Sequence, residues 1–206
     1  MVCRGTEGAV AAILAVCLLT AAGAAQADVV CTYSRQFNLR IPADPDATRG
    51  WMDDATIDVP SHLIIEDLDV SIDLTHPAVF DLQLFLESPS GTIVLLNQYD
   101  PFTGYIEGAD YSVTTFDDEA AVPIEQGSPP FAGSYRPLAG SQLADFDGQD
   151  AYGTWRLRVC DAYYVDTGRF HSFTLTITVP EPATAALLGL ALALARLTPW
   201  PRSRRR

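Results

Sequence analysis

Apolar and polar residues alternate along several short stretches of this chain. In residues 67–74 the even positions are apolar and the odd positions are polar, and residues 82–86, 155–159 and 173–179 repeat this alternation. A period of two with one polar face is typical of antiparallel strands that bury one side. These four stretches therefore predict strands of a sandwich or a barrel.

The segments between these stretches favour an all-β fold. Ser88-Pro89-Ser90-Gly91 predicts a turn that returns the chain into residues 92–96 as a hairpin partner. No stretch between residues 28 and 179 has a sustained helical period. We predict a jelly-roll-like β-sandwich of two sheets and about eight antiparallel strands.

Two long connections, residues 97–112 and 117–150, interrupt the strands. Loops longer than about 12–15 residues are usually functional or disordered. Aromatic rings in the first loop could stack on sugars, or they could plug the end of the sandwich. These aromatic residues are Tyr99, Phe102, Tyr105 and Tyr111.

The first 27 residues have the organisation of a secretory signal peptide. Arg4 precedes an uncharged apolar run over residues 9–22, and Ala25-Gln26-Ala27 has the small-x-small pattern that signal peptidase cleaves. We expect export by the Sec route and a mature chain that begins at Asp28. The alternative, a short membrane anchor, would need about 20 apolar residues.

Residues 179–206 contain three parts in order. Pro180-Glu181-Pro182 precedes an apolar stretch over residues 185–195, and five arginines follow: Arg196, Arg202, Arg204, Arg205 and Arg206. Arginines beyond an apolar segment favour the cytoplasm for that end, which leaves the preceding domain outside. Because the stretch is short for a permanent transmembrane helix, we expect a transient anchor in the inner membrane.

This end resembles the PEP-CTERM sorting signal of Gram-negative bacteria, in which a Pro-Glu-Pro motif precedes a hydrophobic segment and a basic tail. The resemblance implies that an exosortase removes the tail near residues 180–182. It also implies a place at the cell surface or in the extracellular matrix, commonly alongside exopolysaccharide and biofilm production. The alternative is a chance apolar tail.

The charge balance is strongly acidic. The chain has 13 arginines, no lysine and 26 acidic residues, for a net charge of -13. Between residues 28 and 179, 7 arginines and 24 acidic residues give -17. This balance argues against nucleic-acid binding, which needs a basic surface to displace counterions from phosphate.

The mature chain keeps two cysteines. Cys3 and Cys17 leave with the signal peptide, and Cys31 and Cys160 remain. In an oxidising compartment an even pair predicts one disulfide, whereas a metal site would need more cysteines at closer spacing.

A series of motifs over roughly residues 40–178 resembles the P domain, or Homo B domain, of proprotein convertases and bacterial subtilases. The resemblance implies a galactose-binding-domain-like jelly roll, which in the convertases packs against a catalytic domain and stabilises it. We find no segment that resembles that catalytic domain. The motifs are Ile72-Asp73-Leu74-Thr75-His76, Asp81-Leu82, Leu86-Glu87-Ser88-Pro89-Ser90-Gly91-Thr92, Phe116-Asp117-Asp118-Glu119-Ala120, Tyr135-Arg136-Pro137, Gly153-Thr154-Trp155-Arg156-Leu157, Asp161, Asp166-Thr167-Gly168 and Phe173-Thr174-Leu175.

The sequence offers no clear set of catalytic residues. Asp166-Thr167-Gly168 imitates the aspartate motif of a subtilisin triad, but its position predicts a turn between the last two strands. His62, His76 and His171 have no zinc spacing and no evident acid partner, and we expect His76 to make a structural hydrogen bond. Ser90 lies in a hairpin turn rather than a nucleophile elbow. We therefore expect a protein that is not an enzyme.

Acidic loops leave calcium as a candidate ligand, because Ca²⁺ takes six to eight oxygen ligands from carboxylates and carbonyls. Some bacterial P domains bind calcium, and the resemblance extends this to five aspartates, with Asp117 and Asp118 expected at the same end as Asp81. The alternative is a solvated acidic surface. The five are Asp81, Asp117, Asp118, Asp161 and Asp166.

Two classes of function remain. The first is a non-catalytic surface or matrix protein that serves adhesion, biofilm or exopolysaccharide association. The second is an accessory domain that acts in trans on a subtilisin-like serine protease. A stand-alone hydrolase is the least favoured.

Overall fold

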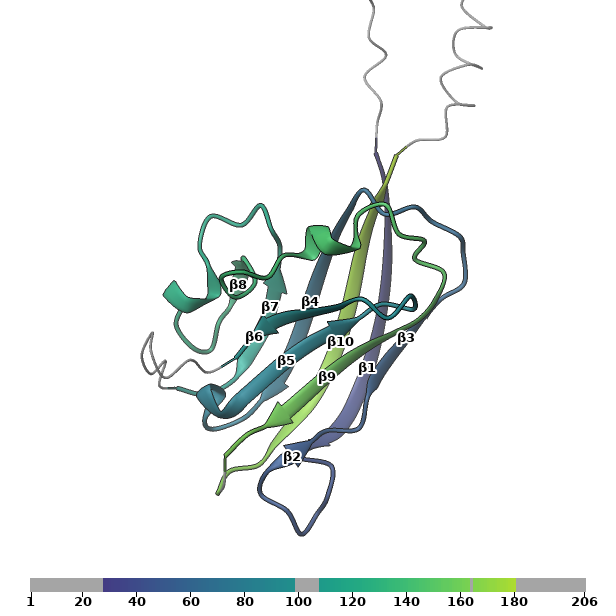
Figure 1. The fold of residues 1–206 in the computed structure, drawn as a ribbon. Coiled ribbons are helices and arrows are strands. Elements are labelled where there is room, and N and C mark those ends of the chain that lie inside the picture. The colour runs from purple at the N-terminus through teal and green to yellow at the C-terminus, as the bar shows by residue number, and fades with distance from the viewer. Residues whose placement is uncertain (1–27, 99–107, 164, 181–206) are drawn as a thin grey trace, which may run out of the picture. The chain divides into compact units, whose positions relative to one another are not determined.

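The computed structural model describes residues 28–98, 108–163 and 165–180, and within them ten strands form two sheets (Figure 1). The β4 sheet has the order β1 (Val29–Ile41), β10 (Gly168–Val179), β4 (Asp67–Thr75), β7 (Tyr111–Phe116) and β8 (Gly133–Tyr135). The β9 sheet has the order β2 (Gly50–Trp51), β9 (Gly153–Asp161), β5 (Leu82–Glu87) and β6 (Ile93–Asn97), and β3 (Ala55–Val59) also pairs with β9. Three 3-10 turns, η1 (Val79–Asp81), η2 (Ile124–Gln126) and η3 (Leu143–Phe146), lie in the connections.

The predicted all-β sandwich is confirmed, with two differences in detail. Ten strands replace the expected eight or so, and β7 pairs with β8 in parallel while the other pairs are antiparallel. The extra strands are short or lie at edges, where burial on one face alone does not impose a visible alternation.

The core lies between the two sheets and uses the alternating apolar positions. In β4 the side chains from Leu68 to Leu74 at even positions are at most 1% exposed, and Trp155 in β9 is fully buried. The Trp155 indole N–H donates to the Ala151 carbonyl at 2.9 Å. Each such buried apolar side chain contributes about 1.5–3 kcal/mol relative to exposure, so these stretches hold the sheets together.

The predicted hairpin between β5 and β6 is also confirmed. The Ser88 N–H donates to the Thr92 carbonyl at 2.9 Å, and Gly91 has a φ of 89°, which favours glycine. The Ser90 hydroxyl donates to Gln149 Oε1 at 2.6 Å. Ser90 is therefore a turn residue, as the sequence predicts.

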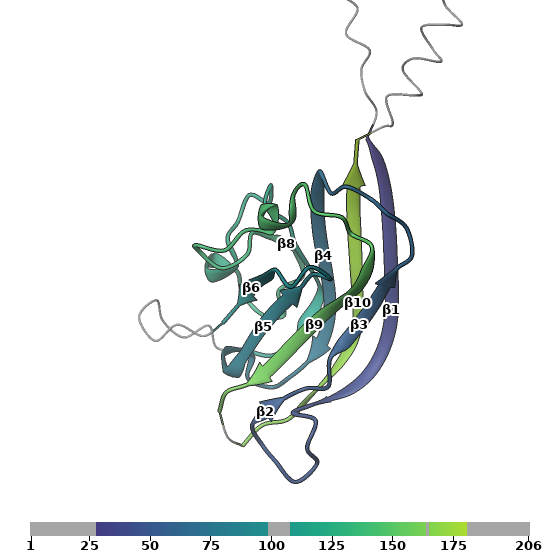
Figure 2. The ribbon, with the colours of Figure 1, turned by 45° about the vertical axis from the view of Figure 1, so that its right-hand side comes forward.

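The pairing of the edge strand β1 with β10 brings the two ends of the described domain together. Val29 pairs with Val179, and Ile41 pairs with Gly168. We call the end of the sandwich at Val29 and Val179 the terminal end, and the opposite end the distal end. Figure 2 shows β1 and β10 meeting side by side at the terminal end.

The expected disulfide is not formed, and both cysteines are free. Cys31 lies near the terminal end of β1, where it pairs with Ile177. Cys160 pairs with Trp51, whose carbonyl accepts a hydrogen bond from the Ala43 N–H, so Cys160 lies at the distal end. At about 3.3 Å per residue the ten residues from Cys31 to Ile41 span about 30 Å, whereas a disulfide needs Cα atoms within about 7 Å.

The first long connection ends in the core rather than at a sugar-binding surface. Tyr111 is fully buried at the start of β7, its ring stacks on Phe131 at 4.9 Å, and its hydroxyl accepts from Asn97 Nδ2 at 2.7 Å. Sugar stacking by Tyr111 is therefore wrong, and the plugging alternative holds for this residue. Tyr99, Phe102 and Tyr105 lie outside the described residues.

The targeting segments also lie outside the described residues, except for Pro180. Within residues 28–98, 108–163 and 165–180, no helix is long and apolar enough to cross a membrane. The signal peptide and the sorting signal remain predictions.

Candidate functional site at the distal end

Three polar side chains are buried together at the distal end. His76 follows β4, Asp81 ends η1 and Asp161 ends β9, and they are 1%, 3% and 1% exposed. The two aspartates adjoin because Leu82 pairs with Asp161 and the Ala162 N–H donates to the Asp81 carbonyl at 2.8 Å. The sandwich therefore brings two carboxyl groups and one imidazole out of water.

His76 is held by bonds at both ring nitrogens. Its Nε2 lies 3.2 Å from Asp161 Oδ2, and its Nδ1 lies 3.2 Å from the Ala78 nitrogen. Nδ1 also lies 2.9 Å from the Ala78 carbonyl oxygen, to which it donates when it carries the proton. When Nε2–H donates to Asp161 instead, Nδ1 accepts from the Ala78 N–H. This confirms the expectation of a structural hydrogen bond, but it corrects the expectation that no histidine has an acid partner.

Gly168 allows β10 to pass close to His76. A Cβ atom at position 168 would lie 2.3 Å from the Thr75 carbonyl oxygen and 2.6 Å from the His76 ring. Because both neighbours are fixed, only glycine fits at this position. Asp166 and Thr167 lie in the turn between β9 and β10, as their position in the sequence predicts, and Gly168 begins β10.

Asp81 lacks the partners that Asp161 has. Asp161 Oδ1 accepts from the Tyr163 N–H at 3.2 Å, whereas Asp81 Oδ1 is buried with no hydrogen-bond partner. Burial and then the charge of Asp161 raise the pKa of Asp81 to about 6, with Asp166 adding to the rise and His76 opposing it. Asp81 is a buried acid that no cation among the described residues neutralises.

The expected calcium ligands do not form one site. Asp81 and Asp161 adjoin, and the charge of Asp166 acts on Asp81. Asp117 and Asp118 instead follow β7 at the other end of β4, since Phe116 pairs with Val70. The expectation that they share an end with Asp81 is wrong.

Asp118 also has a structural role. Its two carboxylate oxygens accept the backbone N–H groups of Leu143 and Ala144 at 3.0 and 2.8 Å, which fixes the start of η3. Asp117 Oδ1 accepts the N–H of Glu119 at 2.7 Å. In the described part of the chain, no three His, Cys, Asp or Glu side chains are grouped so as to hold a metal ion.

The densest acidic surface lies at the terminal end. Burial, followed by the charge of Asp117, raises the pKa of Asp69 to about 6, and burial likewise raises the pKa of Asp67. The carboxyl groups here are part-exposed or exposed, so water solvates them. They line a hollow of about 540 Å³: Asp28, Glu66, Asp67, Asp69, Asp117 and Glu119.

A second histidine–aspartate pair lies at the surface. His62 Nδ1 is 2.6 Å from Asp150 Oδ2, and the His62 ring stacks on Tyr152 at 4.3 Å. The hydrogen bond from His62 lowers the pKa of Asp150. The pair ties two connections together, because residues 62 and 150 are in separate loops.

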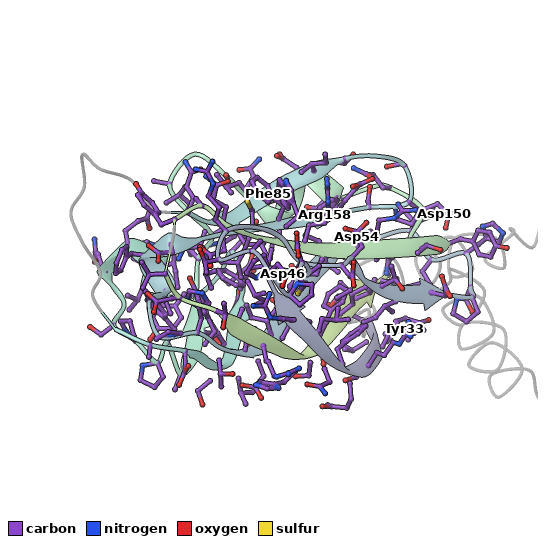
Figure 3. All side chains as sticks on the ribbon, turned by 90° about the horizontal axis from the view of Figure 1, so that it is seen from below. Tyr33, Asp46, Asp54, Phe85, Asp150 and Arg158 are labelled. Carbon is purple, nitrogen blue, oxygen red and sulfur yellow. The ribbon has the colours of Figure 1, made fainter. Side chains whose placement is uncertain are left out.

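The outer face of the β9 sheet carries an aromatic and arginine surface. Trp51 is 46% exposed, the Arg158 guanidinium lies 4.7 Å above its ring, and Phe85 packs against it at 5.8 Å. Arg158 Nε lies 3.4 Å from Asp54 Oδ1. Figure 3 shows Arg158, Asp54 and Phe85 gathered on one side of the molecule. We call Trp51, Phe85 and Arg158 the Trp51 surface.

Sequence reasoning missed both histidine–aspartate pairs, because 88 and 85 residues separate their members. One signal was available for the buried pair. His76 and Asp161 each lie at the end of a strongly alternating stretch, and strand ends are where polar groups of two packed sheets can meet.

The fold and the site define a β-sandwich domain whose distal end buries a carboxylate–histidine cluster. The family model described as "Proprotein convertase P-domain" matches residues 65–177, more than half of the 206-residue chain. The chain belongs to this family.

Solved structures provide distant likenesses. A chain in the crystal structure of the complex of an Aeromonas sobria serine protease and the chaperone is 18% identical, with a TM-score of 0.45, over 76% of this chain and 28% of that chain. The structure of the Aeromonas sobria serine protease is 19% identical to this chain, with a TM-score of 0.42. The match covers 73% of this chain and 27% of that chain. A structure of the infectious bursal disease virus Gt strain is 16% identical, with a TM-score of 0.31. That match covers 73% of this chain and 32% of that chain. No curated protein matches the chain.

Proposed function

We propose that this protein is a non-catalytic, exported accessory domain that acts by binding another macromolecule. One observation carries the proposal. In the described residues, His62 and His76 are bonded to aspartates and backbone groups, and neither ring is bonded to a hydroxyl or a thiol. The His171 Nε2 lies 3.0 Å from Thr75 Oγ1, but that ring has no hydrogen bond to an acid in the same part of the chain. A serine-type centre needs a nucleophile bonded to a histidine that also bonds an acid. The His62–Asp150 pair instead connects two loops, and the His76–Asp161 pair joins the end of β4 to the end of β9.

The absence of catalysis is tested with peptide, ester and glycan substrates. We expect turnover at background level for the exported chain. His76→Ala, His62→Ala and Ser90→Ala serve as matched variants. Turnover above background that disappears in any one of them would refute the non-catalytic proposal.

The first candidate partner is the catalytic domain of a subtilisin-like serine protease. Membership of the P-domain family supports it. The Trp51 surface is the contact that we assign to this protein partner, since tryptophan and arginine are the residues that most often dominate protein–protein binding. Asp54 and Glu87 balance Arg156 and Arg158 there, which leaves the exposed indole as the main apolar contact.

This partner is tested by mixing the exported chain with subtilisin-like catalytic domains from the producing cell. We expect the melting temperature of the cognate catalytic domain to rise, and Trp51→Ala to weaken binding about tenfold or more. Val113→Ala is the matched control, because Val113 is 68% exposed on the other sheet. Equal effects of the two variants would exclude the Trp51 surface.

The second candidate is a surface or matrix role, and the Pro180-Glu181-Pro182 motif with its apolar segment and arginine tail supports it. Intact mass of the exported protein is the test. We expect a chain that begins at Asp28 and ends near Pro182 in cells with an exosortase, and a longer chain in cells without one. A surface form that retains Arg202–Arg206 would contradict this candidate.

A matrix partner would be exopolysaccharide. Glycan arrays and binding to polysaccharide from the producing strain distinguish it from a protease partner. Binding to glycan without binding to any catalytic domain would favour the matrix role, with adhesion or biofilm as its setting.

A further inference from the structure

The starting observation is a pair of arginines directly opposite each other on neighbouring strands. Arg40, near the end of β1, pairs with Arg169, near the start of β10, and Thr75 of β4 pairs with Arg169 on its other side. The next residues, Ile41 and Phe170, are buried, so both arginines lie on the outer face of the β4 sheet. Like charges directly opposite each other on neighbouring strands destabilise a sheet. The fold therefore tolerates an unfavourable charge pair at the distal end.

Neutral groups hold the two side chains in place. Arg40 Nη1 donates to the Pro42 carbonyl at 2.9 Å and also to the Asp44 carbonyl. Arg169 Nη1 donates to Asn38 Oδ1 at 3.0 Å. Because these acceptors are carbonyl oxygens, they orient the guanidinium groups without neutralising their charge. An arginine has five N–H donors, so each side chain keeps donors for a further partner.

Other arginines of the domain are neutralised by acids. Arg156 and Arg158 on the β9 sheet form ion pairs with Asp54 and Glu87. In the described part of the chain, no carboxylate forms an ion pair with either arginine of the opposed pair, although residues 28–179 contain 24 acidic residues. The opposed pair is therefore positioned to take an acidic group from outside the chain.

Both arginines line a hollow of about 470 Å³, which we call the Arg40–Arg169 hollow. Thr75, Thr167 and Asp110 line it as well. Asp110 Oδ1 accepts the backbone N–H of His76 at 2.9 Å, which leaves Oδ2 as an acceptor. Sites for small ligands commonly have volumes of about 300–1,000 Å³. The hollow thus combines two cations, one carboxylate acceptor and two hydroxyl-bearing residues in a space of that size.

We propose that the Arg40–Arg169 hollow binds a sugar residue that carries a carboxylate, that is, a uronic acid. The carboxylate matches the arginines, since a guanidinium group forms charge-assisted, bidentate hydrogen bonds with it. The sugar hydroxyls match Asp110, which accepts, and the threonines, whose hydroxyls both donate and accept. This inference rests on the matrix role proposed above and names the kind of sugar that the domain binds.

An acidic side chain of a protein partner fits the same groups less well. A Glu or Asp side chain supplies a carboxylate but no hydroxyl to donate to Asp110, and the charge of Asp110 repels it. A polymer with a charge on every unit is also disfavoured, because residues 28–179 have a net charge of -17. We therefore expect a polysaccharide in which neutral sugars separate the uronic acids.

The test titrates the exported chain with small probes while its amide NMR spectrum is recorded. The probes are the methyl glycosides of glucuronic and galacturonic acid, methyl glucoside, and N-acetylglutamate amide. We expect at least one uronide to give saturable shifts at residues of the Arg40–Arg169 hollow. The glucoside, which lacks the carboxylate, and the glutamate derivative, which lacks the hydroxyls, should bind about tenfold more weakly or less.

Two arginine variants make the test specific. Arg169→Gln removes one guanidinium group from the hollow, and Arg35→Gln is the matched control, because Arg35 is an exposed arginine of β1 outside the hollow. We expect Arg169→Gln to weaken uronide binding about tenfold or more, and Arg35→Gln to keep it within about twofold. The melting temperature of Arg169→Gln should be unchanged or higher, because the repulsion between opposed arginines is removed.

Three results would overturn this site. They are no saturable shift with either uronide, equal affinity for N-acetylglutamate amide, and equal weakening by Arg169→Gln and Arg35→Gln. The second would assign the hollow to an acidic protein partner, and the third would indicate a general effect of charge.

The matrix role fails in a different way. Uronide binding that depends on Arg169, without binding to polysaccharide of the producing strain, would support the site and contradict the matrix role. Polysaccharide binding that is equal in the wild type and in Arg169→Gln would support the matrix role and overturn the site.

Discussion

The two ends of the sandwich contain the same chemical groups in opposite circumstances. At the terminal end, acidic side chains such as Asp67 and Asp69 crowd a hollow surface that remains in contact with water. At the distal end only Asp81 and Asp161 adjoin, but both are buried and one of them has an oxygen without a partner. The number of acidic residues at an end therefore does not show whether that end buries a carboxylate oxygen without a partner.

The largest expected contrast comes from removing one acid at each end. Asp161→Ala leaves His76 Nε2 and the Tyr163 N–H without acceptors, and we expect a loss of about 2 kcal/mol in the free energy of unfolding. Asp117→Ala should change it by less than about 0.5 kcal/mol, since one local bond is lost while repulsion falls. Urea unfolding in chelator at neutral pH measures both. Equal losses would remove the distinction between the ends.

Asp118 sharpens the comparison, because it is an acid of the terminal end with a structural role. Asp118→Ala leaves two N–H groups of η3 without acceptors, and we expect a loss of about 1 kcal/mol. Asp118→Asn should recover about half of it through the remaining amide oxygen. Urea unfolding is again the measurement. A neutral Asp118→Ala would show that solvent replaces the carboxylate fully.

A smaller effect is expected from the pH dependence of the terminal end. The pKa of Asp69 is raised from 3.8 to about 6 in the folded chain, so folding takes up a proton between these values. The contribution of Asp69 to stability is therefore full below about pH 4 and lost as the pH rises through about 6. Asp69→Asn should raise the melting temperature at neutral pH by a degree or two and flatten its rise on acidification. An unchanged pH profile would contradict the raised pKa.

The smallest effect concerns the cysteines, one near each end. We expect two thiols per chain to react with a thiol reagent in denaturant, and Cys31→Ser and Cys160→Ser each to change stability by less than about 1 kcal/mol. Burial raises the pKa of Cys160, so its thiol should react slowly in the folded chain. The absence of any reactive thiol in denaturant would instead support the predicted Cys31–Cys160 disulfide.

The strands that bury one face were predictable, and the edges were not. β4, β5, β9 and β10 alternate because each has one face in the core, and their registers follow from that alternation. β1 is a 13-residue strand that is exposed over most of its length, so its sequence shows no clear period. β2 and β8 have too few residues for a pattern.

The site was predictable only in part. Asp81 and Asp161 were among the expected calcium ligands, and the family resemblance added Asp117 and Asp118 by placing them at the same end of the sandwich. Which end of the sandwich a loop occupies depends on strand direction, and β7 runs back along β4 toward Asp67. The partnerless oxygen of Asp81 depends on atomic packing, which no sequence pattern encodes.

The pairing of Val29 with Val179 has a mechanical consequence. A chain held by both ends would carry load across the β1–β10 ladder from its terminal end inward, and its hydrogen bonds would open one after another like a zipper. If the chain were cleaved before Asp28 and tethered through Pro180, one strand alone would hold the domain and no load would cross the ladder. Such a tether would point the His76 end away from the point of attachment.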